Sequence, residues 1–302
     1  MKHFDFRDFS IEKLIEKKRS LNLSIGLALP VFNEAGTIVS TLKVADKLLK
    51  SCLIDKIIVV DSESEDGSDL LCSRFGVKYV RGEDVATKLK VKYVKGKGWN
   101  LWASVYALKT DIIIWIDSDI RNIDDRFIVG LTGPMIMDNE IKFIKGYYNR
   151  PEGGGRVTEI MVRPFINMLF PKVQSFIQPL SGEYGGRRKF FEKMFFYSGY
   201  SVDIALLIQA TELFSHNEIG QVYLEKRLHK NQDLSALSKM SVEIMHILFQ
   251  IAQEQHKLKL FQEIGNTFRY FIPNDSGLFY ENIYNLNDIK LPPLTSFKQN
   301  YS

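Results

Sequence analysis

Short apolar runs alternate with amphipathic stretches along the first part of the chain. The apolar runs are rich in branched side chains and have the length of buried strands, over residues 24–29, 56–60, 77–80 and 111–116. The amphipathic stretches predict helices over residues 11–21, 37–50, 68–73 and 99–108. This βαβαβ order predicts an α/β fold with a mostly parallel, Rossmann-like sheet flanked by helices and joined by right-handed crossovers.

The pattern changes in the second half of the chain. We expect strands over residues 141–147 and 220–224, and helices over residues 157–169, interrupted by Pro164, and 202–214. Residues 178–186 are rich in turn formers and are not expected in the core. Residues 238–271 predict a long helical C-terminal extension, followed by a polar, loosely held tail. The resulting division is a helical lead (1–23), a first α/β half (24–150), a second half (151–237) and the extension (238–302).

Composition narrows the class of protein. The 302 residues are 45% hydrophobic and 25% charged, which is ordinary for a globular protein. The net charge of +4 admits an anionic small molecule but not a dedicated nucleic-acid binder. Cys52 and Cys72 have neither metal-site nor disulfide spacing, and no signal-like or membrane-spanning apolar run is present. These features predict a cytoplasmic protein with no membrane partner.

Polar loops follow three of the predicted strands, at residues 30–34, 61–66 and 117–119. In a parallel sheet these strand ends open on the same edge, where α/β folds bind ligands. Asp117 and Asp119, one residue apart, supply hard oxygen ligands that suit Mg²⁺ or Mn²⁺ against a phosphate. The alternative is turn chemistry, because acidic residues also end strands and begin helices.

Two glycine-rich loops each precede a predicted helix. Residues 95–98 (KGKG) combine lysine charge with a helix start that favours phosphate, although a basic surface loop has the same composition. Residues 153–158 (GGGRVT) offer backbone amides, an arginine fork and a hydroxyl to a carboxylate or phosphate. A flexible loop before a capped helix is the alternative interpretation of the second segment.

Arg227 and His229 follow the strand predicted over residues 220–224. Because they alternate, they would face the same side of an extended chain. His229 can complete a metal site begun by Asp119, or it can be a structural histidine with satisfied hydrogen bonds.

With these segments aligned, the chain resembles the glucosyl-3-phosphoglycerate synthases, which are retaining glycosyltransferases of the GT-A fold. The match runs from about Leu27 to Leu237. It is carried by residues 29–34 (LPVFNE), 60–62 (VDS), 96–98 (GKG), 117–119 (DSD), 130–134 (GLTGP), 145–148 (KGYY), 154–159 (GGRVTE), 178–184 (QPLSGEY) and 227–231 (RLHKN). The GGRVTE and QPLSGEY segments are the most specific to this family.

The resemblance implies two sets of donor-binding residues. The first would hold the uracil and ribose or lie near the diphosphate: Pro30, Glu34, Ser62 and Lys97. In the second, Asp119 and His229 would bind Mg²⁺ or Mn²⁺ against the diphosphate, with Asp117 and Ser118 supporting the donor sugar or ribose.

The resemblance also implies residues at the acceptor and the reacting centre. The phosphate and carboxylate of 3-phosphoglycerate would be received by Gly155, Arg156 and Thr158. The junction of donor and acceptor would be lined by Gly182, Glu183 and Tyr184. The residues expected at the reacting centre are Asp117, Asp119, Glu183, Asp203 and Arg227.

The implied reaction moves glucose from an NDP-glucose, in the first place UDP-glucose, to the 2-hydroxyl of D-3-phosphoglycerate with retention. The alternatives are transfer from GDP-mannose to the same acceptor, transfer to a lipid phosphate, and nucleotide-sugar binding without turnover. The resemblance also implies a homodimer, with the helix from Ser238 as a candidate interface. The product would serve a compatible-solute or a polysaccharide pathway.

Two positions depart from the family pattern. Glu63 stands where glycine is usual, which can alter contacts to the base or ribose. Asp203 stands where glutamate is usual, so the carboxylate is one methylene shorter close to the expected sugar pocket.

Overall fold

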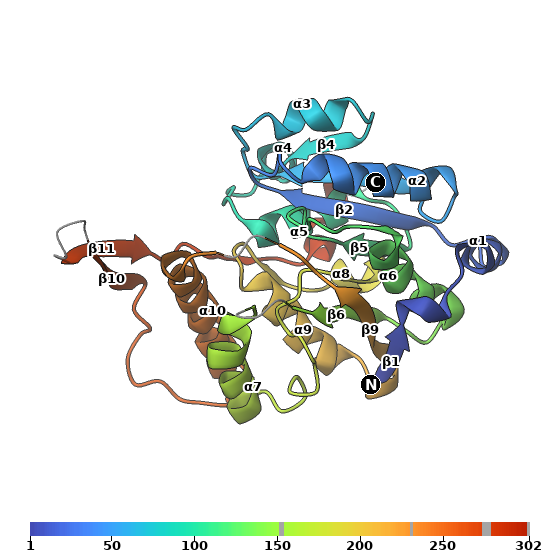
Figure 1. Cartoon of the computed structure of the whole chain (residues 1–302). Helices are drawn as coiled ribbons and strands as arrows, with labels where there is room; N and C mark the ends of the chain where they lie inside the picture. Colours follow the sequence, from blue (N-terminus) through green and yellow to red (C-terminus); the bar gives the residue numbers. More distant parts are fainter. Residues whose placement is uncertain (151–153, 230–231, 274–278, 301–302) are drawn as a thin grey trace.

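A single eight-stranded sheet organises the molecule, and helices cover both of its faces (Figure 1). The computed structural model describes residues 1–150, 154–229, 232–273 and 279–300. The strand order is β1-β9-β6-β7-β5-β2-β3-β4. These strands are β1 (Lys2–Asp5), β2 (Ile25–Val31), β3 (Lys56–Asp61), β4 (Lys78–Arg81), β5 (Ile112–Trp115), β6 (Phe143–Asn149), β7 (Tyr184–Arg187) and β9 (Ile219–Lys226).

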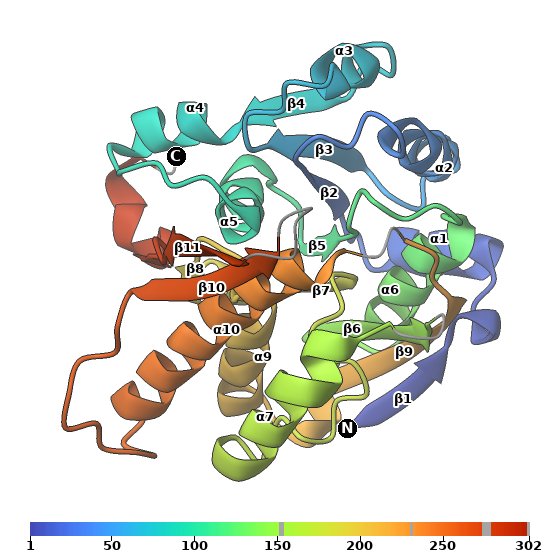
Figure 2. The same ribbon diagram turned by 60° about the vertical axis from the view of Figure 1, so that its left-hand side comes forward.

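The helices form two layers with a hydrophobic core under each (Figure 2). One core includes Leu14, Leu42 and Phe127 from α1 (Ile11–Ser20), α2 (Ile38–Lys50) and α6 (Asp125–Met137). The other includes Trp99 and Leu206 from α5 (Lys97–Ala107) and α9 (Val202–Leu213), and side chains of α10 (Leu234–Glu254). The remaining helices are α3 (Ser68–Ser73), α4 (Gly82–Leu89), α7 (Arg163–Leu169) and α8 (Arg188–Phe191), with helical turns η1 (Phe6–Asp8), η2 (Thr158–Val162), η3 (His216–Glu218) and η4 (Leu294–Asn300).

Most of the neighbouring strand pairs in the sheet are parallel, which confirms the predicted fold class. β2 pairs in parallel with both β3 and β5, so the ends of these three strands lie on one edge. The loops at residues 30–34, 61–66 and 117–119 leave the sheet at that edge, as expected from the sequence.

Residues 178–186 were expected to lie outside the core, and this prediction is wrong for residues 184–186. β7 begins at Tyr184, is buried throughout, and pairs antiparallel with β5 and β6. A Cβ on Gly185 would lie 2.6 Å from Ile113 O, and one on Gly186 would lie 2.6 Å from Lys142 O. The two glycines therefore allow close approach of neighbouring backbones, which the turn-based interpretation did not consider.

The N-terminal segment is helical only in part. The helix predicted over residues 11–21 is α1, but β1 precedes it and pairs in parallel with β9 at the edge of the sheet. Helices α4 and α6 were not predicted. The sheet thus takes strands from three of the four predicted segments, and the division itself stays a prediction.

The C-terminal segment combines a helix with a hairpin. The helical prediction holds up to Glu254, where α10 ends, but it is wrong beyond that point, because residues 255–266 are not helical and a strand begins at Thr267. β10 (Thr267–Pro273) pairs antiparallel with β11 (Phe279–Asn285), and this hairpin projects beyond the sheet (Figure 1). The tail is also held: β12 (Lys290–Leu291) pairs with β8 (Phe196–Tyr197), and Leu294 is buried. Within the described ranges, none of the helices has the length and apolar character needed to span a membrane.

Candidate active site

A cavity of about 470 Å³ lies at the edge of the sheet where β2, β3 and β5 end. Most of the residues singled out from the sequence line it: Pro30, Glu34, Ser62, Lys97, Asp117, Ser118, Asp119, Gly155, Arg156, Thr158, Asp203, Arg227 and His229. The other three lie behind this lining. Glu183 and Tyr184 are fully buried, and Gly182 packs against Asp117.

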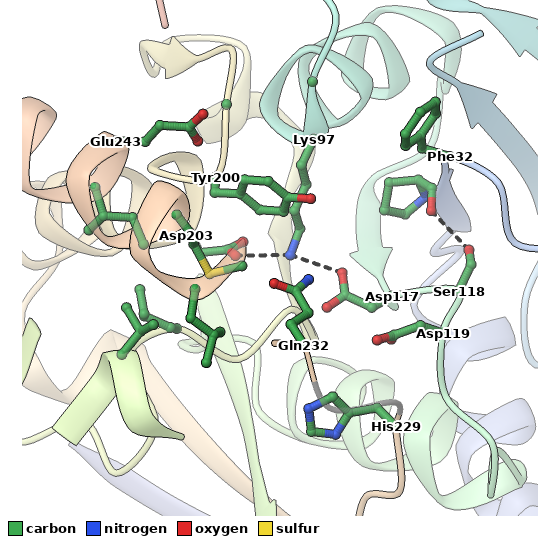
Figure 3. A pocket seen from close by; sticks show the side chains of 18 of the residues that line it. Phe32, Lys97, Asp117, Ser118, Asp119, Tyr200, Asp203, His229, Gln232 and Glu243 are labelled. Atoms are coloured by element: carbon green, nitrogen blue, oxygen red, sulfur yellow. Dashed lines mark hydrogen bonds and ion pairs between the residues drawn. The ribbon is translucent and has the colours of Figure 1, made fainter. Parts of the chain in front are cut away.

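Asp117 is at the centre of a network of ion pairs, and Figure 3 shows its contact with Lys97. Its Oδ1 lies 2.9 Å from Lys97 Nζ, and its Oδ2 lies 3.3 Å from Arg227 Nη2. The same Lys97 Nζ lies 2.9 Å from Asp203 Oδ2. Burial alone raises the pKa of Asp117, but attraction to Lys97 and Arg227 outweighs it, so the pKa lies below its ordinary value.

Arg227 joins the acidic residues from the opposite side. Its Nη2 lies 2.7 Å from Asp119 Oδ1, and its Nε lies 3.2 Å from Glu183 Oε1. Neither oxygen of Glu183 accepts a well-aligned hydrogen bond within the described residues. Burial raises the pKa of Glu183, and attraction to Arg227 opposes that shift. Glu183 is therefore the most strongly desolvated acid of the site.

Asp119 and His229 lie at the same end of the cavity (Figure 3). The buried Nδ1 of His229 has no hydrogen-bond partner within the described residues. Burial, reinforced by repulsion from Arg227, lowers the pKa of His229, which favours the neutral imidazole that binds metals. No group of three His, Cys, Asp or Glu side chains in the described ranges forms a metal site. A carboxylate and a neutral imidazole are donor types that Mg²⁺ or Mn²⁺ would accept, with its other positions open to phosphate oxygens and water.

One part of the cavity wall is built on the loops after β2 and β3. Ser118 Oγ donates to Pro30 O over 2.9 Å, which fastens the acidic loop to the end of β2. Ser62 Oγ donates to Asn100 Oδ1 over 2.8 Å. Phe32 is about half exposed at the cavity rim, with Lys95 Nζ 4.1 Å from its ring centroid. The sequence pattern had assigned no role to Phe32 or Asn100, although both line the cavity.

The prediction that backbone amides at the start of α5 bind an anion is wrong. The amides of Gly98 and Trp99 donate to Gly199 O and Ser198 O, over 3.2 and 3.0 Å. A Cβ on Gly98 would lie 1.7 Å from Tyr197 O. The glycine therefore lets the helix start approach another backbone segment instead of a ligand. Lys97 still reaches the cavity, as predicted, through its side chain.

Another part of the cavity wall is formed by residues 154–158. Gly155 has a φ of +79°, a conformation that favours glycine, and Thr158 is buried. Arg156 Nη2 donates to Gln232 O over 2.9 Å. Three residues of the expected motifs, Gly153, Lys230 and Asn231, lie outside the described residues.

Arg150 also lines the cavity, beside residues 154–158, and the sequence pattern did not identify it. Its guanidinium stacks over the Tyr148 ring at 5.4 Å and lies against Gly155. Its buried Nε has no hydrogen-bond partner within the described part of the chain. Arg227 and Lys97 are neutralised by carboxylates, but none of the ion pairs between described residues includes Arg150. Among the described residues, Arg150 and Arg156 therefore line the cavity without a carboxylate partner, so their charges are available for an anionic ligand.

Comparison with known proteins places this site in a family. Residues 27–199 match the model for Glycosyl transferase family 2. The chain is 40% identical over 266 residues to the glucosyl-3-phosphoglycerate synthase of Petrotoga mobilis, covering 84% of this chain and 81% of the relative. It is 36% identical to the enzyme of the same name from Mycolicibacterium smegmatis, covering 74% and 76%. The chain belongs to the glucosyl-3-phosphoglycerate synthase family of glycosyltransferases.

Solved structures of this family agree with the assignment. The structure of the Mycobacterium tuberculosis glucosyl-3-phosphoglycerate synthase with Mn²⁺, UDP and glucosyl-3-phosphoglycerate has a TM-score of 0.84 at 30% identity, covering 95% of this chain and 96% of that one. A mannosyl-3-phosphoglycerate synthase from Rubrobacter xylanophilus has a TM-score of 0.89 at 27% identity, covering 98% and 97%.

The two departures from the family pattern have distinct structural settings. Glu63 has a φ of +61°, so the position that is usually glycine keeps a left-handed backbone at a cost of ~1 kcal/mol. Both oxygens of Asp203 are engaged, one by Lys97 and the other by the hydroxyl of Tyr184 over 3.0 Å. The shorter carboxylate of Asp203 is thus held by the protein itself.

Proposed function

We propose that this protein transfers glucose from UDP-glucose to the 2-hydroxyl of D-3-phosphoglycerate, with retention at the anomeric carbon. The observation that carries the proposal is the joint lining of one cavity by Asp119, His229 and the residue 154–158 loop. The M. tuberculosis relative has been solved with Mn²⁺, UDP-glucose and phosphoglyceric acid.

Asp119 and His229 are the residues proposed to hold Mg²⁺ or Mn²⁺. The bound cation would supply Lewis acidity that neutralises charge on the departing diphosphate. Lys97 and Arg227 contribute fixed positive charge to the same region, and both are already oriented by Asp117. Charges that are held in place before the reaction stabilise a developing charge without reorganisation.

Arg156, Thr158 and Arg150 are proposed to position the acceptor. Held by its phosphate and carboxylate, the acceptor can present its 2-hydroxyl to the anomeric carbon from the side of the leaving group. On that side the diphosphate oxygen can take the hydroxyl proton, so this route requires no protein base. Pro30, Glu34 and Ser62 are proposed to hold the nucleotide at the other end of the cavity.

The relatives favour glucose over mannose. Curated synthases named for glucose reach 40% identity to this chain, and among the solved structures the M. tuberculosis glucosyl enzyme is 30% identical against 27% for the R. xylanophilus mannosyl enzyme. The combination of Asp117, Asp119 and His229 in one cavity argues against binding without turnover, because binding alone does not require them. No feature of the described chain favours a lipid-phosphate acceptor over 3-phosphoglycerate.

The homodimer, the cytoplasmic location and the compatible-solute or polysaccharide role of the product stay predictions from the sequence. The helix α10 remains the proposed dimer interface, and the β10–β11 hairpin adjoins it with exposed Phe271 and Ile283.

Incubation of the protein with UDP-glucose, 3-phosphoglycerate and Mg²⁺ tests the proposal. We expect release of UDP together with a glucosyl-3-phosphoglycerate whose anomeric configuration is α, as in the donor. Omission of the acceptor and addition of EDTA should each stop the reaction. Release of UDP at the same rate without acceptor would indicate hydrolysis and contradict the proposal.

A further inference from the structure

A loop at residues 198–201 joins β8 to α9. Hydrogen bonds hold this loop to a carboxylate from the C-terminal segment. Asp288 Oδ1 accepts hydrogen bonds from Ser198 Oγ and from the amide of Gly199, both over 2.8 Å. Asp288 Oδ2 accepts a third hydrogen bond, from Ser201 Oγ. Three donors of one short loop thus converge on a single side chain from about ninety residues further along.

The opposite side of the same loop holds the start of α5. Ser198 O accepts from the amide of Trp99, and Gly199 O accepts from the amide of Gly98. The carbonyl of Ser198 and the amide of Gly199 belong to one peptide unit. Asp288 therefore binds one end of this peptide while α5 binds the other. A rotation of the peptide would break both contacts, and glycine at position 199 makes such a rotation sterically easy.

The two elements that meet at this loop present an ion pair to the cavity. Lys97 is the first residue of α5, and Asp203 lies in the first turn of α9. Lys97 Nζ lies 2.9 Å from Asp203 Oδ2 and 2.9 Å from Asp117 Oδ1 (Figure 3). A shift of the loop would displace α5 relative to α9 and would change the place of the Lys97 amine.

We propose that Asp288 is a positioning residue for glycosyl transfer, acting through the residue 198–201 loop on the Lys97–Asp203 pair. It lies outside residues 27–199, the part of the chain that matches the family 2 model. The C-terminal segment thereby has a part in the reaction besides completing the fold. For its activity readout this inference rests on the proposed function.

The contact is suited to a local test because other interactions keep the C-terminal segment attached. The amide of Ser198 donates to Ile289 O over 3.0 Å, and β12 pairs with β8. Loss of the Asp288 carboxylate removes three hydrogen bonds to the loop but leaves these backbone contacts in place.

Asp288→Ala is the variant that tests the inference, and amide hydrogen exchange and kcat are the two readouts. We expect exchange to become at least about tenfold faster in peptides that contain Gly98 and Trp99, with exchange in β3 unchanged. We expect kcat to fall by about 10- to 100-fold, with a smaller change in the KM for either substrate. Asp288→Asn keeps one acceptor oxygen for the loop. It should therefore keep part of the wild-type kcat and part of the protection from exchange at Gly98 and Trp99.

Glu254→Ala is the matched control. Glu254 pairs with Lys290 over 2.6 Å, so this variant also removes a side-chain contact of the C-terminal segment but does not touch the loop. It should resemble the wild type in both readouts. If Asp288→Ala does not fold, Asp288→Asn decides by the same measurements.

Unchanged exchange at the start of α5 would overturn the inference, whether or not kcat falls. Unchanged kcat together with faster exchange would overturn the link to the reaction. If the wild-type protein shows no transfer from UDP-glucose, the proposed function fails separately, and the exchange comparison still decides whether Asp288 holds α5.

Discussion

Gly182 packs directly against the carboxylate of Asp117. A Cβ at position 182 would lie 1.9 Å from Asp117 Oδ2 and 2.2 Å from its Cγ. Real Cβ atoms do not approach other atoms so closely, so any larger residue must push the carboxylate away from Lys97 and Arg227. The glycine of the QPLSGEY segment therefore has a steric role at the centre of the site.

Gly182→Ala should lower kcat by about 100-fold, because a displacement near 1 Å at a reacting centre has an effect of that size. Steady-state kinetics with UDP-glucose and 3-phosphoglycerate measure this change. Gly265→Ala is the control, since a Cβ at position 265 would have no other atom within 4 Å among the described residues. Near wild-type kcat in Gly182→Ala would show that Asp117 can move without consequence.

His229→Ala should weaken metal binding without abolishing the fold. With Asp119 as the remaining protein ligand, the concentration of Mn²⁺ that gives half-maximal activity should rise at least about tenfold, in line with the loss of one ligand. Asp119→Ala should abolish metal-dependent transfer. A titration of activity against Mn²⁺ measures both, with His216→Ala, at an exposed histidine, as the control. An unchanged Mn²⁺ dependence in His229→Ala would exclude His229 as a ligand.

Arg150→Met should raise the KM for 3-phosphoglycerate by about 10- to 100-fold, because it removes a charge-assisted contact to an anion. The KM for UDP-glucose should change little, since Arg150 is proposed to contact the acceptor and lies against Gly155. Arg156→Ala should act in the same direction. Arg269→Met, at an arginine paired with Glu281 in the hairpin, is the control. Equal increases in the KM for UDP-glucose and for 3-phosphoglycerate would contradict a role of Arg150 in binding the acceptor.

Lys145 gives the protein a distinctive stability profile at alkaline pH. Its side chain is buried, and Nζ donates to Ser181 O over 2.6 Å. Burial lowers the pKa of Lys145 to about 8, against the partial opposition of Asp203. The folded chain therefore releases this proton at a lower pH than the unfolded chain does.

Between about pH 8 and pH 10.5 the unfolded state binds more protons at Lys145, so rising pH favours the folded state. Relative to Lys145→Met, the wild type should gain up to ~3 kcal/mol in unfolding free energy across that window and nothing below it. Chemical denaturation at several pH values measures the difference, with the exposed Lys17→Met as a control. If the difference in unfolding free energy between the wild type and Lys145→Met does not change up to pH 10, the lowered pKa of Lys145 is contradicted.

The sequence was most informative where local pattern and topology agree. The alternation of strands and helices predicts a parallel sheet, and parallel strands bring their polar ends to one edge. Hence Pro30, Ser62 and Asp117 were expected together, and they line one cavity. Arg227 and His229 could be added because they leave the end of β9 on the same side.

Predictions failed where distant segments decide the structure. Gly185 and Gly186 carry a turn signature, yet neighbouring backbones require them in the middle of the sheet. The amides at the start of α5 had the pattern of an anion site, but carbonyls about a hundred residues away occupy them. Nothing near Asp288 in the sequence indicates that it holds the loop at residues 198–201. Such contacts depend on tertiary packing and leave no local periodicity to detect.

A donor competition tests most directly whether the protein transfers glucose from UDP-glucose. The protein is incubated with 3-phosphoglycerate, Mg²⁺ and equal concentrations of ¹³C-glucose-labelled UDP-glucose and unlabelled GDP-mannose, and the mass of the hexosyl-3-phosphoglycerate product is measured by mass spectrometry. If glucose comes from UDP-glucose, almost all of the product should carry the ¹³C label. An unlabelled product, formed from GDP-mannose, or no hexosyl-3-phosphoglycerate at all would contradict it.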